Sequence, residues 1–293
     1  MKDFGLIIVD KPVGPTSHKI VSLVRRGTGV SKVGHAGTLD PRASGVLILC
    51  LGPATRLSEY LSTSSKCYEA VVRFGATTQT YDAEGPVVRR SENVPRLEEI
   101  QLVLPEFRGE IEQVPPPYSA IKVQGEKAYK LARSGKEVQL DPRMVTINHL
   151  EVLKYNPPDL VLDIECTAGT YIRSLAHDLG ERISTGAHLA NLRRTKAGPF
   201  SLEDAIPLPK LEVGFLTNKW ERYLRPAADA LPDLPIVEVE GEDLERIRNG
   251  RRIQAGMGSS GTARAIGPNG DLVAILEVVE GGEKWHPRKV FLG

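Results

Sequence analysis

The chain has 293 residues, with 38 Lys and Arg against 37 Asp and Glu, so its formal net charge at pH 7 is +1. Apolar residues make up 41% and charged residues 26% of the chain, which is ordinary for a globular protein that buries a sizeable core. No apolar run approaches the roughly 20 residues that cross a bilayer, and the N-terminal one is too short for a signal peptide. The three separated cysteines (Cys50, Cys67, Cys166) fit neither a disulfide framework nor a zinc pattern. We therefore expect a cytoplasmic protein without a membrane partner.

In chain order, predicted strands and helices mix without a regular βαβ alternation. The predicted strands, where apolar residues are dense or alternate with polar ones, are 4–12, 45–52, 66–75, 144–155 and 160–169. The predicted helices, with capping residues or glycine stops, are 16–29, 96–107, 126–138 and 170–184. Residues 77–86 form a predicted polar loop, and the three prolines of 113–122 exclude regular structure there. This mixture favours an α+β fold with a mixed sheet.

A domain boundary is predicted at the proline-rich segment 229–241. Residues 1–231 are assigned to a large domain and 232–293 to a small β-rich one, because short strands there are joined by Gly and Asn-Gly turns. A nearly neutral protein can bind nucleic acid only where basic residues gather. Such clusters, each of which also fits a solvated surface balanced by nearby acids, occur at 25–32, 122–136, 193–196 and 246–252.

Asp40 stands on a glycine-rich turn, in the stretch VGHAGTLDPRASG, directly before Pro41. Gly34 and Gly37 allow the backbone to approach a ligand closely or to adopt a positive φ. The residues after Asp40 indicate a turn into a strand, so a helix cap does not explain this carboxylate. An Asx-turn aspartate explains it as well as a catalytic one does. His35, in the same stretch, also fits a core or turn histidine bonded to the backbone.

The sequence lacks the common cofactor motifs: metal-ligand spacings of His or Cys, phosphate-binding and dinucleotide-binding glycine patterns, and the serine hydrolase elbow. We therefore expect no metal or other cofactor, and side-chain chemistry on a carboxylate. Arg173 falls in the first turn of a predicted helix, where the helix dipole disfavours a cation. An aspartate from another loop, such as Asp40, would be a natural partner, although a surface arginine is the alternative. Tyr68 fits a core aromatic or a ring that stacks on a flipped base.

Six blocks of the sequence, in this order, resemble the TruB family of pseudouridine synthases, which isomerise a uridine in the T loop of tRNA. The blocks are LIIVDKPVGPTS, VGHAGTLDPRASGVLILCLGPATRLSEYL, KCYEAVVRFGATTQTYDAEG, PPPYSAIKVQGEKAYKLARSG, GTYIRSLAHDLG and GAHLANLRRTKAGPF. They span about residues 4–205. The resemblance implies the pseudouridine synthase fold, with a mixed, mainly antiparallel central sheet, flanking helices and an RNA-binding insertion around 105–140. Residues 232–293 resemble the PUA-like RNA-binding domain of the family.

The resemblance also implies roles for individual residues. Asp40 would be the catalytic aspartate, Tyr68 the aromatic that packs on the target uracil, and Arg173 the partner of the aspartate. The residues expected to line the nucleotide pocket are His35, which is the candidate wedge for the flipped base, Tyr171, Leu192 and Asp82. Lys11 and Pro12 would support the catalytic loop. The residues expected to contact the RNA backbone are Lys127, Lys130, Arg133, Arg193, Arg194 and Lys196.

The implied reaction breaks the bond from ribose to nitrogen 1 of uracil, turns the base and rejoins it through carbon 5, at position 55 in tRNA numbering. An isomerisation of this kind needs no redox cofactor, nucleoside triphosphate or metal. The carboxylate either attacks the sugar or removes its 2′ proton, and both routes stay open. Tyr68 or a water would take the proton from carbon 5. We expect tRNA as the partner of a monomer that needs no other protein.

Three other functions stay open. The guide-RNA-dependent archaeal and eukaryotic branch of the family shares the Asp40 and Arg173 blocks, although 115–138 resembles the stand-alone bacterial form. A tRNA-folding protein with incidental catalysis would share the basic clusters and tolerate loss of Asp40. A nucleoside hydrolase would release free uracil.

Overall fold

The computed structural model describes residues 4–291, apart from 120, 124 and 135–139. Its largest sheet is mixed, with the strand order β14–β1–β3–β12–β4–β11–β10–β7, and with β2 beside β3 and β13 beside β12. These strands are β1 (Gly5–Lys11), β2 (Val33–Ala36), β3 (Ala43–Leu51), β4 (Lys66–Phe74), β7 (Gly109–Gln113), β10 (Arg143–Asn156), β11 (Asp159–Cys166), β12 (Ala187–Ala197), β13 (Phe200–Ser201) and β14 (Ile206–Pro207). The mixed sheet and its helices confirm the α+β prediction.

The α-helices of the described residues are α1 (Ser17–Thr28), α2 (Ser58–Thr63), α3 (Leu97–Val103), α4 (Ala128–Arg133), α5 (Ile172–Arg182), α6 (Leu208–Leu216) and α7 (Gly241–Arg248). No helix in this part of the chain is long and apolar enough to span a membrane. The chain divides into two compact units. The first comprises the residues up to Asp40, Val46–Ser62 and those from Gly198 onward, and the second comprises Pro41–Gly45 and Thr63–Ala197.

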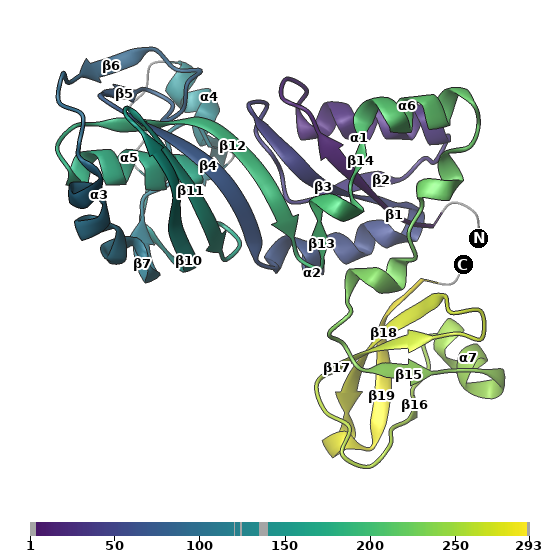
Figure 1. Cartoon of the computed structure of the whole chain (residues 1–293). Coiled ribbons are helices and arrows are strands. Elements are labelled where there is room, and N and C mark those ends of the chain that lie inside the picture. The colour runs from purple at the N-terminus through teal and green to yellow at the C-terminus, as the bar shows by residue number, and fades with distance from the viewer. Residues whose placement is uncertain (1–3, 120, 124, 135–139, 292–293) are drawn as a thin grey trace. The chain divides into compact units, whose positions relative to one another are not determined.

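The first unit begins with the predicted strand and helix. All of β1 is buried except Asp10, and all nine residues of β3 are buried. The side chain of Thr16 caps α1 by accepting a hydrogen bond of 3.1 Å from the backbone nitrogen of Lys19. Gly29 ends the helix with a φ of 74°, which glycine adopts without a steric penalty. In Figure 1, α1 and α6 lie side by side, and the contacts between the two helices agree with that view.

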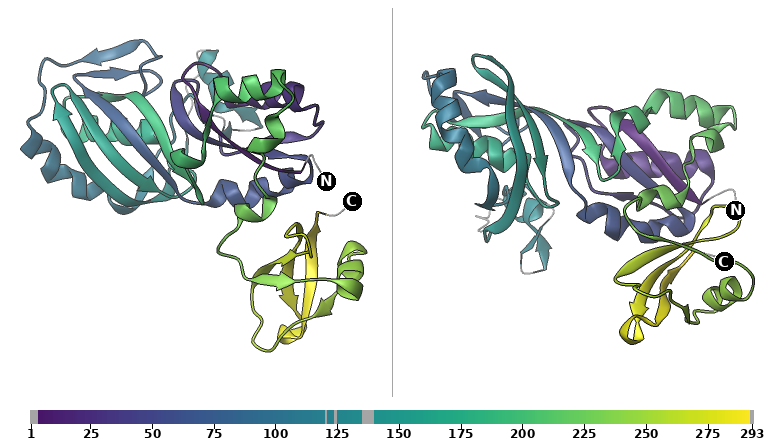
Figure 2. Two further views of the ribbon diagram at one scale, coloured as in Figure 1. Left: turned by 45° about the vertical axis from the view of Figure 1, so that its right-hand side comes forward. Right: turned by 60° about the horizontal axis from the view of Figure 1, so that its bottom comes forward.

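The second unit is a curved antiparallel array of β4, β11 and β10 with α5 against it. Every second residue of β4 is buried, the period of a strand with one face in the core. Helix α5 packs on β12 and β4, as Figures 1 and 2 show, and buries Leu175 and Leu179. A small hairpin of β5 (Ala76–Thr78) and β6 (Val87–Arg90) belongs to the same unit. The sheet therefore forms a platform that fixes the start of α5.

A five-stranded sheet, in the order β15–β17–β18–β19–β16, follows near the C-terminus. Its strands are β15 (Ile236–Glu238), β16 (Ile253–Gln254), β17 (Thr262–Ile266), β18 (Leu272–Val279) and β19 (Lys284–Val290). Ile247 of α7 and Trp285 of β19 belong to its buried core. The β-rich prediction is confirmed, although α7 was not foreseen. The domain boundary between 231 and 232 stays a prediction, since the first unit includes this sheet.

Two local predictions differ from the structure. The basic helix predicted at 126–138 is shorter, because α4 spans Ala128–Arg133 and Lys127 belongs to the two-residue strand β9 (Glu126–Lys127), paired with β8 (Lys122–Val123). Its predicted stop, Gly135, lies outside the described residues. The predicted loop 77–86 begins with strand residues of β5, whose threonines pair with β6. In both places pairing with a neighbouring strand overrides the local preference.

Gly45 permits the close approach of β3 and β12, because a Cβ atom there would lie 2.1 Å from the carbonyl oxygen of Arg194, and its φ is +100°. Gly14 has a similar φ of +113°, but a Cβ atom there would meet nothing within 4 Å. We predict that Gly45→Ala lowers the free energy of unfolding by about 3 kcal/mol or more, from backbone strain plus a clash with backbone atoms. The control Gly14→Ala should lose about 1–2 kcal/mol, from strain alone. Urea unfolding followed by circular dichroism measures both, and equal losses would contradict this account.

Candidate active site

The loop that carries Asp40 is fixed from the start of α1. The hydroxyl of Ser17 donates to the carbonyl oxygen of Leu39 and accepts from its backbone nitrogen, both at 2.9 Å. Gly37 contributes a φ of 89°, which lets the chain turn between β2 and Leu39. Asp40 itself is half-buried and precedes Pro41 outside any regular element. The first unit therefore holds this carboxylate on a loop anchored one residue before it.

Lys11 and His35 lie on strands of the same unit. Lys11 is fully buried, and its ammonium donates to the carbonyl oxygens of Pro12 and Pro15 at 2.9 Å each. These bonds tie the end of β1 to the turn that leads into α1. His35 is half-buried on β2 opposite Leu49 of β3. Lys11 thus supports the segment before α1, and its predicted role beside the catalytic loop stays a prediction.

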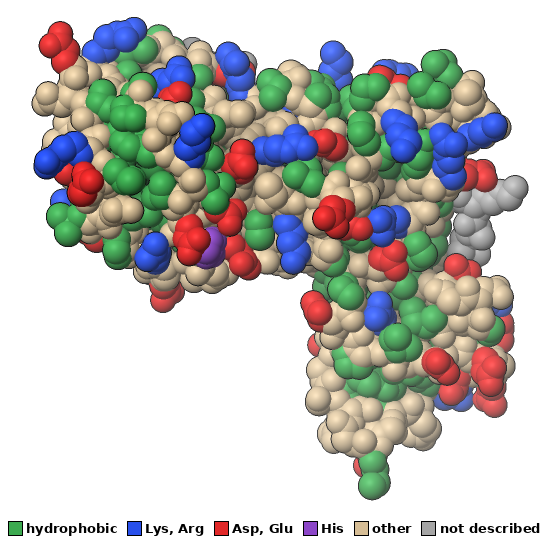
Figure 3. Space-filling model, viewed as in Figure 1, with side chains coloured by type: hydrophobic (Ala, Val, Ile, Leu, Met, Phe, Trp, Pro, Cys, Tyr) green, Lys and Arg blue, Asp and Glu red, His purple; other side chains and the backbone are tan. Residues whose placement is uncertain are grey.

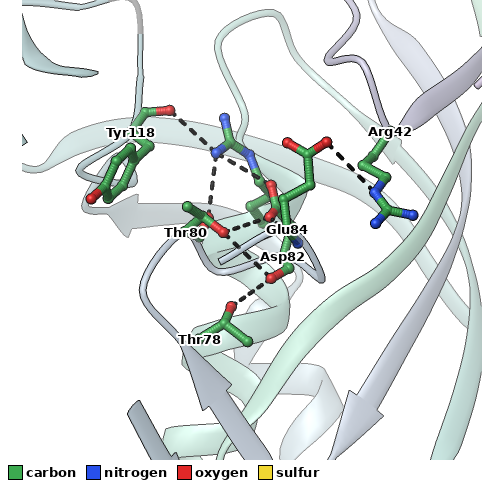
Figure 4. Close-up of polar contacts among 7 residues, drawn as sticks. Arg42, Thr78, Thr80, Asp82, Glu84 and Tyr118 are labelled. Carbon is green, nitrogen blue, oxygen red and sulfur yellow. Dashed lines mark hydrogen bonds and ion pairs between the residues drawn. The ribbon is translucent and has the colours of Figure 1, made fainter. Parts of the chain in front are cut away.

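Asp82 and Arg173 form a buried ion pair in the second unit. One carboxylate oxygen of Asp82 lies 3.7 Å from Nη1 of Arg173, and each residue is only 8% exposed. The other oxygen accepts hydrogen bonds from the hydroxyl of Thr80 at 2.5 Å and from the backbone nitrogen of Glu84 at 3.0 Å. Figure 4 shows Thr80, Asp82 and Glu84 close together in one loop. Because its second oxygen is occupied by the loop itself, the Asp82 carboxylate is held in one orientation toward the arginine.

Arg173 is further fixed by backbone carbonyl groups. Its Nη1 atom donates to the carbonyl oxygens of Thr80 at 3.3 Å and of Tyr118 at 3.2 Å. It is the second residue of α5, where the helix dipole disfavours a cation. Asp82 and the two carbonyl oxygens supply the compensating negative charge. The aspartate that the structure shows beside Arg173 is Asp82, and the predicted pairing of Arg173 with Asp40 stays a prediction.

Tyr68 and Leu192 lie on neighbouring strands. Tyr68 of β4 is 9% exposed and pairs with Ile164 of β11 and Arg194 of β12. Leu192 of β12 is half-buried and pairs with Ala70 of β4. Residues paired across strands, and residues two apart along one strand, point to the same face of a sheet. The pairing therefore places the Tyr68 and Leu192 side chains on one face of the platform.

Tyr171 occupies the N-cap position of α5, two residues before Arg173. Its backbone nitrogen donates to the side-chain oxygen of Gln113 at 2.8 Å, and the Gln113 amide donates back to the Tyr171 carbonyl oxygen at 3.1 Å. The guanidinium of Arg143 lies 5.6 Å from the centre of the Tyr171 ring. These contacts hold the start of α5, and with it Arg173, against β7 and β10.

The predicted RNA-backbone residues differ in exposure. Lys196 and Lys130 are exposed, and Arg193 is half-buried with its guanidinium 3.5 Å from the hydroxyl of Ser44. Arg194 is 1% exposed, and this burial disfavours a direct phosphate contact. The side chains of two residues, Lys127 and Arg133, lie outside the described part of the structure. On the face seen in Figure 3, basic side chains are interspersed with acidic ones.

Sequence reasoning missed two groups of this site. The hydroxyl of Thr80 donates a hydrogen bond to the carboxylate of Asp82, two residues later. Loop side chains often bond to a near neighbour in this way, so a search for Thr-x-Asp in loops could have found this contact. Tyr118 contributes only its carbonyl oxygen, so no residue-type signal exists for it. Tertiary folding alone brings this carbonyl to Arg173.

Other reactive groups do not gather into a second centre among the described residues. No group of three or more His, Cys, Asp or Glu in that part of the chain is arranged to hold a metal ion. Burial raises the pKa of the Cys50 thiol to about 12 and that of Cys166 to about 11. Both thiols are therefore protonated at neutral pH, and a thiol is a poor nucleophile.

Asp178 lies on α5 beyond Arg173. Burial, and then the nearby charge of Glu181, raise the pKa of its carboxyl group from 3.8 to about 6. Between about pH 4 and 6 the folded protein therefore binds more protons than the unfolded chain, so the contribution of Asp178 to stability falls as the pH rises through this window. Above about pH 6 the full cost of a half-buried charge is present.

We predict that Asp178→Asn is more stable than the wild type at pH 7.5 by about 1–2 kcal/mol, since the amide carries no charge to desolvate. The difference should shrink between about pH 6 and 4 and vanish below about pH 4. Urea unfolding at several pH values measures it. Asp233→Asn, at an exposed position, is the control and should change stability little at any pH. A less stable Asp178→Asn at pH 7.5 would contradict the assigned cause.

Three family models match consecutive parts of the chain. They are described as "TruB family pseudouridylate synthase (N terminal domain)" for residues 25–172, "tRNA pseudouridylate synthase B C-terminal domain" for 173–231 and "tRNA Pseudouridine synthase II, C terminal" for 234–292. Together they extend from before the Asp40 loop to the last strand. The models confirm the resemblance drawn from the six sequence blocks.

Similar proteins extend over nearly the whole chain. "tRNA pseudouridine synthase B" of Pseudomonas fluorescens is 43% identical over 290 residues, covering 98% of this chain and 95% of the relative. The protein of the same name from Symbiobacterium thermophilum is 45% identical over 250 residues, covering 84% and 82%. Among solved structures, a chain of the "Crystal Structure of a Cbf5-Nop10-Gar1 Complex" is 29% identical with a TM-score of 0.77, covering 99% of this chain and 86% of that one. By these matches the chain belongs to the TruB family of pseudouridylate synthases.

Proposed function

We propose that this chain converts uridine to pseudouridine in the T loop of tRNA, at position 55 in tRNA numbering, without a guide RNA. Membership of the TruB family makes it a pseudouridine synthase, an isomerase. The proposal for the substrate is carried by identity of 41–45% to relatives named tRNA pseudouridine synthase B. The anchored loop that presents Asp40, in the stretch GHAGTLDP, is the structural feature that the reaction requires.

The proposed catalytic residue is Asp40. In one route its carboxylate attacks C1′, breaks the bond to N1 and is displaced when C5 of the turned uracil attacks C1′. In the other route it removes the 2′ proton, uracil leaves to give a glycal, and C5 then adds to C1′ while the 2′ proton returns. In both routes C5 loses a proton and N1 gains one, so atoms and charge balance. A carboxylate beside a cation stays ionised, and this is the role proposed for Arg173 toward Asp40.

The other predicted residues would hold the nucleotide. Tyr68 would pack on the uracil and is a candidate for receiving the proton from C5, while Tyr171 and Leu192 would line the pocket. His35 would fill the gap left when the base leaves the stack, a step that costs a few kcal/mol. Asp82 acts here through Arg173, to which it is paired. The residues proposed to bind phosphates are Lys127, Lys130, Arg133, Arg193 and Lys196.

The proposed function assigns a role to each of two domains. Residues 1–231 would carry out the chemistry, and residues 232–293 would add RNA affinity as a PUA-like domain. The guide-RNA-dependent alternative is favoured only by structural similarity, at 26–29% identity, to chains from two Cbf5 complexes and from an H/ACA RNP bound to a substrate RNA. Identity above 40% to relatives named tRNA pseudouridine synthase B favours a protein that acts on tRNA, and a monomer without a protein partner stays part of the proposal.

We predict that Asp40→Asn lowers kcat by at least about a thousandfold, because the amide neither attacks the sugar nor accepts the 2′ proton. The measurement is the release of tritium from tRNA that carries tritium on carbon 5 of its uridines. Asp233→Asn, an isosteric change at an exposed residue of the first unit, is the control and should keep wild-type turnover. Near-normal turnover of Asp40→Asn would refute the catalytic assignment and favour a tRNA-folding role.

The purified chain alone should modify an unmodified tRNA transcript, and replacing the uridine at position 55 by cytidine should abolish pseudouridine formation. No activity without added guide RNA and protein partners would favour the guide-dependent alternative. Chromatography of the released material separates the third possibility, since a nucleoside hydrolase would yield free uracil.

A further inference from the structure

Two aromatic rings stack directly beside the Asp82–Arg173 pair. The ring of Tyr81, the residue before Asp82, lies parallel to the imidazole of His177, with centroids 3.8 Å apart and an angle of 5° between the planes. Both residues are half-buried. Rings in parallel contact gain dispersion energy and bury apolar area, so the stack holds the two side chains together.

The backbone of Tyr81 is strained. Its φ is +62°, in the left-handed region that a bulky residue adopts only at an energetic cost. Three hydrogen bonds nevertheless hold this turn: Tyr81 donates to the carbonyl oxygen of Thr78 at 3.2 Å, Leu189 donates to that of Tyr81 at 2.9 Å, and Ala83 donates to that of Leu189 at 3.1 Å. A strained residue persists only where its surroundings over-determine it, and such residues cluster at functional sites.

The geometry of α5 links the stack to the ion pair. His177 follows Arg173 by four residues, so the two side chains are neighbours on the same helix face. The loop therefore meets this face twice: Asp82 reaches Arg173 at 3.7 Å, and Tyr81 covers His177. If Tyr81 relaxed to a negative φ, the direction of the chain into Asp82 would change, and the carboxylate would turn away from the guanidinium.

We propose that the Tyr81–His177 stack is a positioning device that holds the strained turn and thereby fixes the Asp82 carboxylate on Arg173. The inference rests on the proposed function, in which Arg173 serves the catalytic aspartate. Tyr81 and His177 are positioning residues, because they act through Asp82 and Arg173 rather than on the uridine. Loss of the stack should therefore lower turnover and leave tRNA affinity almost unchanged.

The groups around the stack indicate that it depends on the shape of the two rings and not on a charge on either of them. Burial lowers the pKa of His177, a trend that Glu181 opposes and Arg89 reinforces, so the imidazole is neutral at pH 7.5. Burial, with Asp178 and Glu181, raises the pKa of Tyr81, so its phenol is neutral as well. Nδ1 of His177 is buried without a hydrogen-bond partner among the described residues. A phenylalanine at position 177 should therefore keep the contact.

The test compares steady-state tritium release by the full chain and its variants on tRNA at pH 7.5. We expect His177→Ala to lower kcat about tenfold with KM within about twofold of the wild type, and His177→Phe to restore kcat to within about twofold. Tyr81→Gly should lower kcat as much as His177→Ala, because glycine populates positive and negative φ about equally and no ring then holds the turn in the left-handed form. The Tyr81→Gly variant keeps the test decisive if His177→Ala fails to fold. His149→Ala, at a half-exposed strand histidine of the same unit, is the control.

A double-mutant cycle separates positioning from general destabilisation. Once Asp82→Asn has removed the carboxylate, adding His177→Ala should lower kcat by less than about twofold further. Three results would each overturn the inference: full additivity of Asp82→Asn and His177→Ala, wild-type kcat in folded His177→Ala and Tyr81→Gly, or no recovery of kcat in His177→Phe. The single variant Asp82→Asn tests whether Asp82 belongs to the proposed site. Wild-type turnover of this variant would remove Asp82 from the site and would overturn the inference as well. If Asp82→Asn loses turnover while His177→Ala keeps wild-type turnover, the inference is overturned and the proposed function stands.

Discussion

The buried guanidinium of Arg173 is the group on which the rest of the second unit depends. A cation in the first turn of a helix, 8% exposed, is costly unless negative partners surround it. Asp82 and the carbonyl oxygens of Thr80 and Tyr118 meet that requirement from two separate loops. Removing any partner would leave part of a buried charge uncompensated. The arginine therefore determines where both loops must lie.

The sheet platform gives this cluster its rigidity. Helix α5 packs on β12 and β4, and the bonds between Tyr171 and Gln113 tie its first residue to β7. Because interiors are close-packed, such an element transmits small displacements rather than absorbing them. A loop held on α5 by Arg173 and His177 is then positioned as accurately as the helix itself. In the first unit the Ser17–Leu39 bonds have the same effect on the Asp40 loop.

The proposed reaction depends on such positioning. In that proposal one carboxylate meets the sugar of a base that has left its stack, and its charge is maintained inside a partly dry site. Aligned donors and cations supply this when they are already oriented before the substrate arrives. The proposed chain of control runs from the Tyr81–His177 stack through Asp82 to Arg173 and from there to Asp40. The links up to Arg173 are contacts between groups whose orientation is set by packing, and the link from Arg173 to Asp40 belongs to the proposal.

The sequence by itself determined the family and most of the elements. Hydrophobic period and caps located β1, α1, β4 and α5, because these signals are local, and the GHAGTLDP block identified Asp40 as the candidate catalytic residue. The tertiary structure decided the contacts and the burial that depend on distant segments, which local signals in the sequence do not contain. The partner that the structure shows for Arg173 is Asp82, Arg194 is buried rather than exposed, and α4 is shorter than its charge pattern predicted. Tyr81 and His177 meet across 96 positions of sequence only because β4, β12 and α5 pack together, and packing between distant segments leaves no mark on either segment alone.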